Sequence, residues 1–391
     1  MPLLHGLFLI AALAVTVIVP LLPELRRAYD LSTATVALLV AAPGLATLAA
    51  SLPAGLLADR FGARRVTLWA TLMLSISSLA QAAPSYAAVI TGRFVFGVAF
   101  GMVWTTGVAW MAQSHAPGGS GRLGAVSTSA AVGIIVGPAF GGVVGQHFGV
   151  AAPFLVLGAV TAALAAALFM LDEPGPATGS RRQPAALRKA LRLVRGEPNG
   201  LCGTLGLIIV GVVAGATQLL VPLQLHEAGF SASATGFVFA IAAGAYIVVS
   251  ATIVRLGGRA ITPRISAVAC LLLAVSLLPA VLHGGAVAVI GALVLSAAGR
   301  GAVNTISYPL GARSEATHEV GEGVVMGILN SGWAVGFVLA PLIAGWLDEL
   351  AGPGPAWLIA VIPGALGALL MLRSARAPSF APCRAGLGAS Q

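Results

Sequence analysis

Charged residues are scarce in this sequence. They make up 8% of its 391 residues, whereas hydrophobic residues make up 58%, and the mean hydropathy is +0.98. A soluble globular domain carries about 25% charged residues, so this composition excludes that class. We therefore expect a protein that crosses a membrane several times.

Cysteine is also rare, and the three cysteines, Cys202, Cys270 and Cys383, lie far apart in the chain. Their spacing fits neither a disulfide framework nor a Cys/His metal site. Motifs for binding nucleotide phosphates and for metal- or serine-based hydrolysis are missing too. We expect no enzyme activity, no metal and no cofactor, so an ion gradient would have to drive any transport.

Basic residues outnumber acidic ones, 21 to 12, which gives a net charge of +9. In a soluble chain this excess would suggest nucleic acid, but no basic patch interleaved with aromatic residues occurs here. Positive loops that face anionic lipid account for the excess in a membrane protein. The expected partner is the lipid bilayer, not nucleic acid.

Twelve apolar segments are long enough to cross a bilayer, and their solid apolar runs favour helices over the alternating strands of a barrel. The segments cover 5–25, 32–57, 66–84, 86–111, 123–145, 152–171, 200–224, 234–254, 265–282, 286–309, 323–346 and 355–373. No cleavage signal follows the first segment, so it is expected to be retained. An even number of crossings puts both termini on one side.

Arginine positions set the expected orientation. When the turn at 55–65 is placed in the cytoplasm, nearly all basic residues fall on the cytoplasmic side. Arg26 and Arg27 lie outside, and only Arg93 and Arg300 lie within crossing segments. We expect a cell membrane protein, in an inner or plasma membrane, with both termini cytoplasmic.

A proline- and glycine-rich stretch, 172–199, is the one long linker. Within it, residues 185–195 are predicted to form a short basic amphipathic helix at the membrane surface. The linker separates an N-terminal six-helix lobe, 1–171, from a C-terminal six-helix lobe, 200–373. A cytoplasmic tail, 374–391, follows.

Internal repetition supports the same division. Gly133-x-x-x-Gly137 recurs as Gly332-x-x-x-Gly336, about half the chain later. Each short glycine motif is weak evidence by itself. A second pattern, Arg-x-Gly-x-Arg, occurs at residues 60–64 and again at residues 255–259, with a similar offset along the chain. The repetition predicts two related lobes.

The turn between the second and third segments carries the most specific motif. Its sequence, GLLADRFGARR from Gly55 to Arg65, resembles the G-x-L-A-D-R-x-G-x-R-R motif of major facilitator superfamily transporters. The resemblance implies an all-α membrane fold of twelve helices in two pseudo-symmetric six-helix lobes around a central substrate cavity. It also implies that Asp59 latches the lobes together on the cytoplasmic side. The gating residues expected here are Gly55, Asp59, Arg60, Gly62, Arg64 and Arg65.

A second motif lies in segment 123–145. It reads GIIVGPAFGG and resembles the G-x-x-x-G-P-x-x-G-G motif of the drug:proton antiporter families within the superfamily. Glycines at this spacing allow close helix contact, and proline can kink the helix. The resemblance implies export. Its residues, expected to serve as a sliding contact, are Gly133, Gly137, Pro138, Gly141 and Gly142.

Arg93 and Arg300 lie inside crossing segments, where a charge is costly unless it is paired or lines water. Arg93 fits the family pattern R-x-x-Q-G-x-G with Phe96 in place of glutamine; it is expected to serve either proton coupling or a structural role. Arg300 shares a helix face with Asn304 and is expected either to line the cavity or to cap the carbonyls of a broken helix. Further candidates for substrate contact are Trp104, Gln218, Tyr246, Asn330 and Trp333.

Acidic residues are missing from the interiors of the crossing segments. Exporters of cationic drugs in the family commonly use a carboxylate there, so we expect a neutral or anionic amphiphile, attracted by Arg300. Proton coupling would have to use Glu24, His226, Glu227 or Asp59, all near helix ends.

The expected function is proton-coupled efflux of a small amphiphilic drug or natural product by a monomeric secondary transporter, and hence multidrug and antibiotic resistance. Two alternatives stay open. One is a permease that takes up a small organic anion, and the other is a membrane receptor on the same fold that does not transport.

Overall fold

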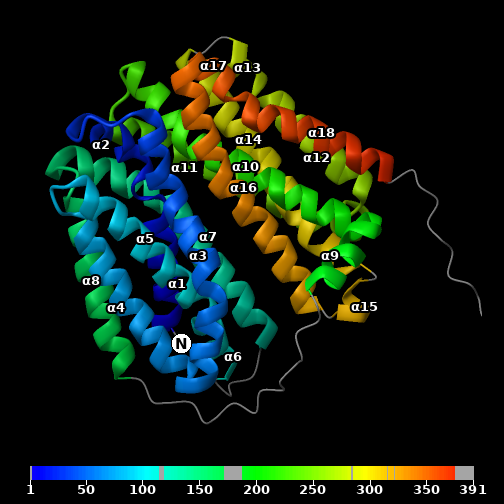
Figure 1. Cartoon of the computed structure of the whole chain (residues 1–391), viewed down its shortest axis with the longest axis horizontal. Helices are drawn as coiled ribbons and strands as arrows, with labels where there is room; N and C mark the ends of the chain where they lie inside the picture. The colour runs from blue at the N-terminus through cyan, green and yellow to red at the C-terminus, as the bar shows by residue number, and fades with distance from the viewer. Residues whose placement is uncertain are drawn as a thin grey trace, which may run out of the picture.

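The computed structural model describes residues 2–113, 119–170, 187–282, 285–314, 316–320 and 322–374. Within these ranges the chain is helical and has no strand. Figure 1 shows long helices running side by side between two ends of the molecule.

The first six crossings come from residues before the linker. They are α1 (Pro2–Thr16), continued by η1 (Val19–Leu21) and α2 (Leu22–Ala28); α3 (Thr33–Phe61); α4 (Ala63–Gln81); α5 (Tyr86–Met102), continued by η2 (Val103–Gly107) and α6 (Val108–Gln113); α7 (Gly119–Phe148); and α8 (Ala152–Phe169). We call these helices the first group.

The remaining helices form the second group. They are α9 (Leu187–Gly196), α10 (Pro198–Glu227), α11 (Ala232–Leu256) with η3 (Gly257–Arg259), α12 (Pro263–Ser276) with α13 (Leu278–Leu282), α14 (Ala286–Ala312), α15 (Ala316–Val320), α16 (Glu322–Ala351), and α17 (Pro353–Ala356) with α18 (Leu358–Ser374). The basic helix expected at 185–195 is α9, while 171–186 lie outside the described residues. Helix α10 begins slightly before the expected lobe boundary.

All twelve expected crossings correspond to helices. Eleven of the described segments are long and apolar enough to span a bilayer, and the twelfth crossing is α4. Helix α4 is less apolar because it carries Arg64 and Arg65 in its first turn and several hydroxyl side chains further on. These hydroxyls are buried, and Thr67 and Thr71 donate hydrogen bonds to carbonyls of the preceding turn.

Helix ends follow local chemistry. Ser32, Ser85, Ser231 and Thr262 are N-cap residues whose side-chain oxygens accept backbone N–H bonds at the starts of α3, α5, α11 and α12. Gly62, with a φ of 88°, makes the tight turn between α3 and α4. Only glycine adopts that conformation without a Cβ penalty.

Each group has its own packing. In the first group α1 packs against α7, α3 against α5, and α4 against α5 and α8. In the second, α10 packs against α14 and α16, α11 against α14, and α12 against α14 and α18. The groups meet mainly where α3 packs against α16 and α7 against α11.

The contacts between the groups lie at one end. We call the end with the Gly62 turn the motif end, and the end where α2 leads into α3 the far end. At the far end, the Ala34 N–H donates to Glu349 Oε1 at 2.7 Å, and the Ser233 N–H donates to Gln146 Oε1 at 3.0 Å.

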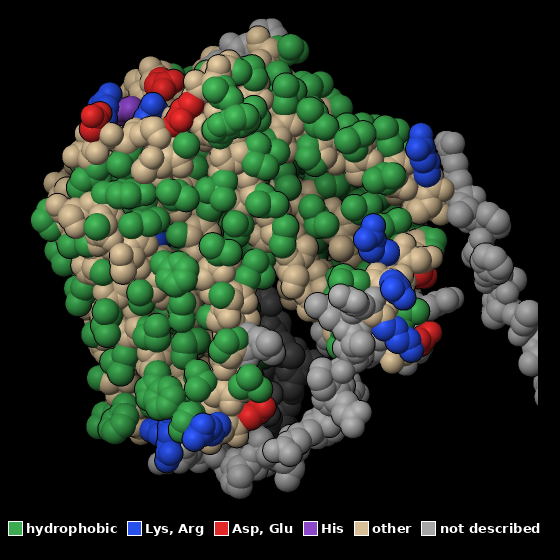
Figure 2. All heavy atoms as spheres, viewed as in Figure 1, with side chains coloured by type: hydrophobic (Ala, Val, Ile, Leu, Met, Phe, Trp, Pro, Cys, Tyr) green, Lys and Arg blue, Asp and Glu red, His purple; other side chains and the backbone are tan. Residues whose placement is uncertain are grey.

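The surface is hollowed between the two groups at the motif end, the lower end of Figure 2. Hydrophobic side chains cover the belt between the two ends in the same view. The two groups thus form a V that is closed at the far end and open at the motif end.

Candidate functional site

A polar cluster forms around Arg300 in the second group. Arg300, Asn304 and Tyr308 follow one another at helical spacing along one face of α14. The Tyr246 phenol of α11 interacts with the side chains of Arg300 and Asn304. The Nε atom of Arg300 is buried and has no hydrogen-bond partner among the described residues. A half-buried guanidinium with a free donor is suited to bind an anionic or carbonyl group of a ligand.

Helix α16 extends this cluster. The Tyr308 hydroxyl donates to Asn330 Oδ1 at 2.6 Å. One turn further along α16, the Trp333 ring stacks on Phe337 with centroids 5.0 Å apart. The structure therefore brings together Tyr246, Arg300, Asn304 and Asn330, with Trp333 beside them. We call these residues, with Tyr308, the Arg300 cluster.

An aromatic row lies along α5 in the first group. Phe96 and Phe100 have ring centroids 5.8 Å apart, and Phe100 and Trp104 have centroids 6.0 Å apart. Phe8 of α1 meets the Trp104 ring edge to face at 5.1 Å. The indole N–H of Trp104 is buried and lacks a hydrogen-bond partner among the described residues. We call these four residues the aromatic row.

Trp104 does not lie in a regular α-helix, as the continuous segment 86–111 implied. It lies in η2, a π-helical turn between α5 and α6. Such turns contain an extra residue and are frequent at functional sites. The π-turn changes the direction in which Trp104 points, and periodicity in the sequence gave no sign of it.

The two groups repeat one local structure that the sequence reading missed. The Thr105 hydroxyl donates to Gly101 O at 2.9 Å in the first group, and the Thr305 hydroxyl donates to Gly301 O at 2.7 Å in the second. Both glycines allow close packing, Gly101 against Thr47 of α3 and Gly301 against Tyr246 of α11. By the sequence offset of this repeat, Phe100 and Trp104 correspond to Arg300 and Asn304 of the second group.

Gln218 lies on α10, a helix that packs against α14 and α16. Its side chain is partly exposed. Among the described residues, no hydrogen bond or ion pair joins it to the Arg300 cluster. Gln224, nearly two turns nearer the far end, accepts a hydrogen bond from the Trp357 indole at 3.3 Å.

Arg93 is fully buried and does not reach toward the membrane surface. Its Nε donates to Leu39 O of α3 at 2.9 Å, and its guanidinium lies 5.3 Å from the centre of the Phe96 ring. In a regular helix Leu39 O would accept from residue 43, but residue 43 is proline and has no N–H. Arg93 therefore satisfies the carbonyl that Pro43 leaves free, which supports its structural role.

Replacing Arg93 with methionine should lower the thermal stability of the purified protein, because Leu39 O loses its donor in a buried site. The expected cost is about 1–3 kcal/mol, the usual penalty for a buried unsatisfied carbonyl. Adding Pro43→Ala restores the backbone donor and should recover most of the loss. Melting midpoints in detergent measure both effects. A double variant no more stable than Arg93→Met would contradict this role.

The gating residues expected from the first motif lie at the open motif end. Asp59 and Arg60 are exposed, and the Arg60 guanidinium lies 5.1 Å from the Phe61 ring centre. Arg64 donates to Phe169 O of α8 at 2.6 Å, which ties α4 to α8. Gly55 is partly buried, and Thr105 is the one described residue within 4.0 Å of the position of a Cβ. Arg65 is exposed at the start of α4.

The glycine motif of α7 has two faces. A Cβ on Gly133, Gly137 or Gly141 would meet α1, at Leu9, Leu13 and Val17. The same arrangement recurs in the second group, where Gly332 and Gly336 of α16 face α10.

Gly142 faces the other way, across the boundary between the groups. A Cβ there would meet the backbone of Ala232 and Ser233 in α11. Close by, the backbone of Pro138 packs against Gly236 of α11. The motif thus combines a contact inside the first group with a contact between the groups, and a sliding contact between the groups would involve Gly142 and Pro138.

Twelve membrane-crossing helices in two groups, joined at one end and separated at the other, define a multi-pass membrane transport protein. Residues 4–324 match the sequence pattern of the Major Facilitator Superfamily. The chain belongs to this superfamily of transporters. The expectations of an all-α transporter fold and of a protein that is not an enzyme are confirmed.

Two curated relatives match part of the chain. Multidrug resistance protein 2 of Bacillus subtilis is 29% identical over 174 residues, which are 44% of this chain and 43% of that protein. An uncharacterised MFS-type transporter of Schizosaccharomyces pombe is 29% identical over 166 residues, or 40% and 37% of the two chains. The matches span less than half of each relative.

Solved structures resemble nearly the whole chain. A bacterial homologue of the human lysosomal transporter Spinster, inward-facing and unoccupied, has a TM-score of 0.74 at 18% identity and covers 95% of this chain and 92% of its own. The human organic anion transporter MFSD10 has a TM-score of 0.62 at 21% identity, with coverage of 95% and 98%. At these identities the likeness shows the fold alone.

Proposed function

We propose that this transporter exports small amphiphilic compounds that are neutral or anionic. The observation that carries the proposal is the contrast between equivalent sites of the two groups. One site offers the guanidinium of Arg300 with a free donor, and the other offers the partly exposed rings of Phe100 and Trp104. A ligand with a polar or anionic head and an apolar body would satisfy both.

The division into two lobes is part of the proposal. The lobes, 1–171 and 200–373, would rock about the contacts at the far end, exposing the site to each side of the membrane in turn. Linker 172–199 would join them, with tail 374–391 beyond. Basic side chains gather at the motif end of the first group (Figure 2), so by the positive-inside rule this end faces the cytoplasm of a cell membrane.

On this orientation the structure is inward-open, as the Spinster homologue is described to be. Asp59 would then act when the motif end closes, by approaching the positive end of a helix in the second lobe. Its exposure in the open state agrees with such a role.

Export is favoured over uptake by the glycine motif and by the partial likeness to Multidrug resistance protein 2. A proton gradient is the proposed driving force, and the D-xylose–proton symporter, with a TM-score of 0.72, is a proton-coupled example of the fold. An anion permease remains the second candidate because Arg300 would also attract a substrate for uptake.

Cellular accumulation tests the proposal. A host that lacks its own efflux pumps is given cationic, neutral and anionic amphiphiles, with and without this protein. We expect neutral or anionic compounds to be depleted from cells several-fold, and depletion to stop when an uncoupler collapses the proton gradient. Depletion of cations alone would contradict the proposed substrate class, and energised accumulation would support the permease.

A further inference from the structure

A cavity of about 340 Å³ lies at the far end, between α2 of the first group and α10 of the second. Its charged lining residues are Arg26, Arg27, Asp30, His226 and Glu227. It lies far from the Arg300 cluster, at the end of the molecule where the groups meet. Any opening of the far end must separate its two walls.

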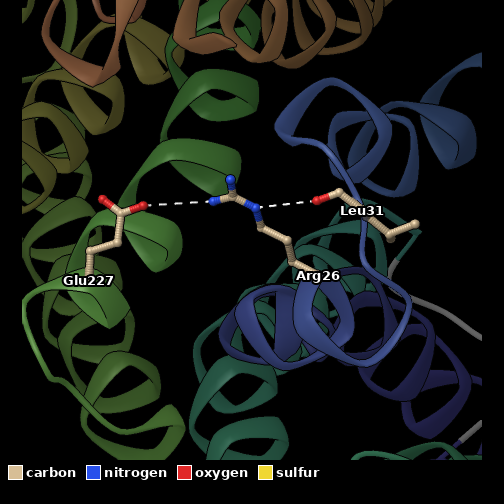
Figure 3. Close-up of polar contacts among 3 residues, drawn as sticks. All are labelled: Arg26, Leu31 and Glu227. Atoms are coloured by element: carbon tan, nitrogen blue, oxygen red, sulfur yellow. Dashed lines mark hydrogen bonds and ion pairs between the residues drawn. The ribbon is translucent and has the colours of Figure 1, made fainter.

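An ion pair joins the walls at the surface (Figure 3). Arg26 Nη1 lies 3.7 Å from Glu227 Oε1, and Arg26 Nε donates to Leu31 O at 3.4 Å. The two paired side chains are 36% and 62% exposed. An exposed pair at this distance contributes little, about 0–1 kcal/mol. The ion pair alone cannot hold the far end closed.

Two further titratable side chains at the same boundary are half-buried, and each has one atom that solvent does not reach. Glu24 Oε2 and His226 Nε2 are both inaccessible to solvent, and neither has a hydrogen-bond partner among the described residues. The Glu24 carboxylate interacts electrostatically with His226 and Arg27. An unpartnered carboxylate oxygen is costly to bury, and a proton removes that cost.

The other charged groups nearby are not buried in this way. Asp30 and Glu227 are exposed, and exposed Glu349 of α16 accepts from the Ala34 N–H and interacts with Arg26. Asp348, its neighbour, is partly exposed. Among the titratable residues described at this boundary, only Glu24 and His226 have a buried side-chain atom without a hydrogen-bond partner.

We propose that Glu24 and His226 together form a proton-binding site that controls closure of the far end. One proton is held by the pair when α2 and α10 come together, and it returns to solution at the far end when they separate. The closed state binds the proton more tightly because it excludes water from the Glu24 carboxylate, and a proton removes the charge that is costly to bury there. By linkage, acid then favours the closed far end.

This site rests on the proposed rocking of two lobes but not on any substrate. The test therefore uses the full chain in lipid nanodiscs without substrate. Spin labels are placed at Ala28→Cys and Ala228→Cys, on exposed residues at the ends of α2 and α10, after the three native cysteines are changed to alanine. Pulsed electron resonance measures the distance between the labels from pH 5 to pH 9.

In this labelled parent protein we expect short distances between the two labels to dominate at acid pH and longer distances at basic pH. The ratio of closed to open protein should change at least about tenfold over this range. Glu24→Gln imitates the protonated carboxyl and should keep the far end closed at every pH. His226→Gln should move the midpoint by at least about one pH unit.

Asp30→Asn is the matched control, because it removes a carboxylate charge at the same boundary from an exposed position that lines the cavity. It should keep the pH profile of the labelled parent. Distances that do not change with pH in the parent overturn the proposal, and so does a Glu24→Gln profile equal to that of the parent. An unchanged midpoint in His226→Gln overturns the pairing. Failure of the efflux assay would leave all these results standing.

Discussion

Replacing Arg300 with alanine should abolish transport while folded protein remains in the membrane. The side chain supplies the only cation of the Arg300 cluster, and its Nε is buried without a partner. Loss of a desolvated charged contact to a ligand costs about 2–5 kcal/mol, which corresponds to at least about a 30-fold fall in transport. Initial rates of efflux, normalised to protein in the membrane, give the measurement.

Two variants make this result specific. Arg300→Lys keeps the charge but loses the planar set of donors, so it should retain only part of the activity. Arg264→Ala removes an exposed arginine at the start of α12 and should transport normally. Wild-type rates in Arg300→Ala would remove this residue from the substrate site.

Alanine at Gly142 should block transport with little loss of folded protein. Its Cβ would collide with the backbone of Ala232 and Ser233 across the boundary between the groups. Because backbone cannot move aside as a flexible side chain can, the far end should no longer close, and transport should fall at least about tenfold. Efflux rates measure the loss, and the spin-label distance at the far end should lengthen.

Gly141→Ala is the neighbouring control and should behave differently. Its Cβ would meet Val17 O of α1, inside the first group. Overpacking should lower the stability of the fold by about 1–3 kcal/mol, so less folded protein should reach the membrane. Transport per folded molecule should stay near normal. Equal phenotypes for the two variants would contradict the division of the motif into two faces.

The sequence predicted the crossings well because long apolar runs are a direct physical requirement of the bilayer. Each predicted segment has its helix, even where Pro43, Pro138 or Pro222 lies inside one. The ends were less accurate: α10 starts at Pro198 and α4 ends at Gln81, since capping and turns decide ends locally.

Side-chain directions were harder to predict. Gly141 and Gly142 are adjacent, yet about 100° of helical rotation sends one toward α1 and the other toward α11. A proline inside a helix leaves a carbonyl free, but only the three-dimensional structure shows that Arg93 satisfies the one left by Pro43. The sequence offers no rule for which distant side chain donates a hydrogen bond to such a free carbonyl.

The Arg300 cluster was predicted in part. Helical spacing linked Arg300 to Asn304 in advance, whereas Tyr246 and Asn330 were named without a known neighbour. Their convergence depends on how α11, α14 and α16 pack, which the spacing within one helix cannot specify. The repeat of Gly101 and Thr105 as Gly301 and Thr305 was visible in the sequence at an offset like that of the other repeats.

The polar side chains of α4 affect how this helix is inserted into the membrane during synthesis. A segment with two arginines in its first turn and with Ser75, Ser77 and Ser78 further on would partition poorly into lipid by itself. Its hydroxyls are inexpensive to bury only once they bond to carbonyls of their own helix or, as Ser75 does, to Gly158 of α8. During synthesis, α4 should therefore leave the translocon together with later helices, and its final insertion should wait for α8.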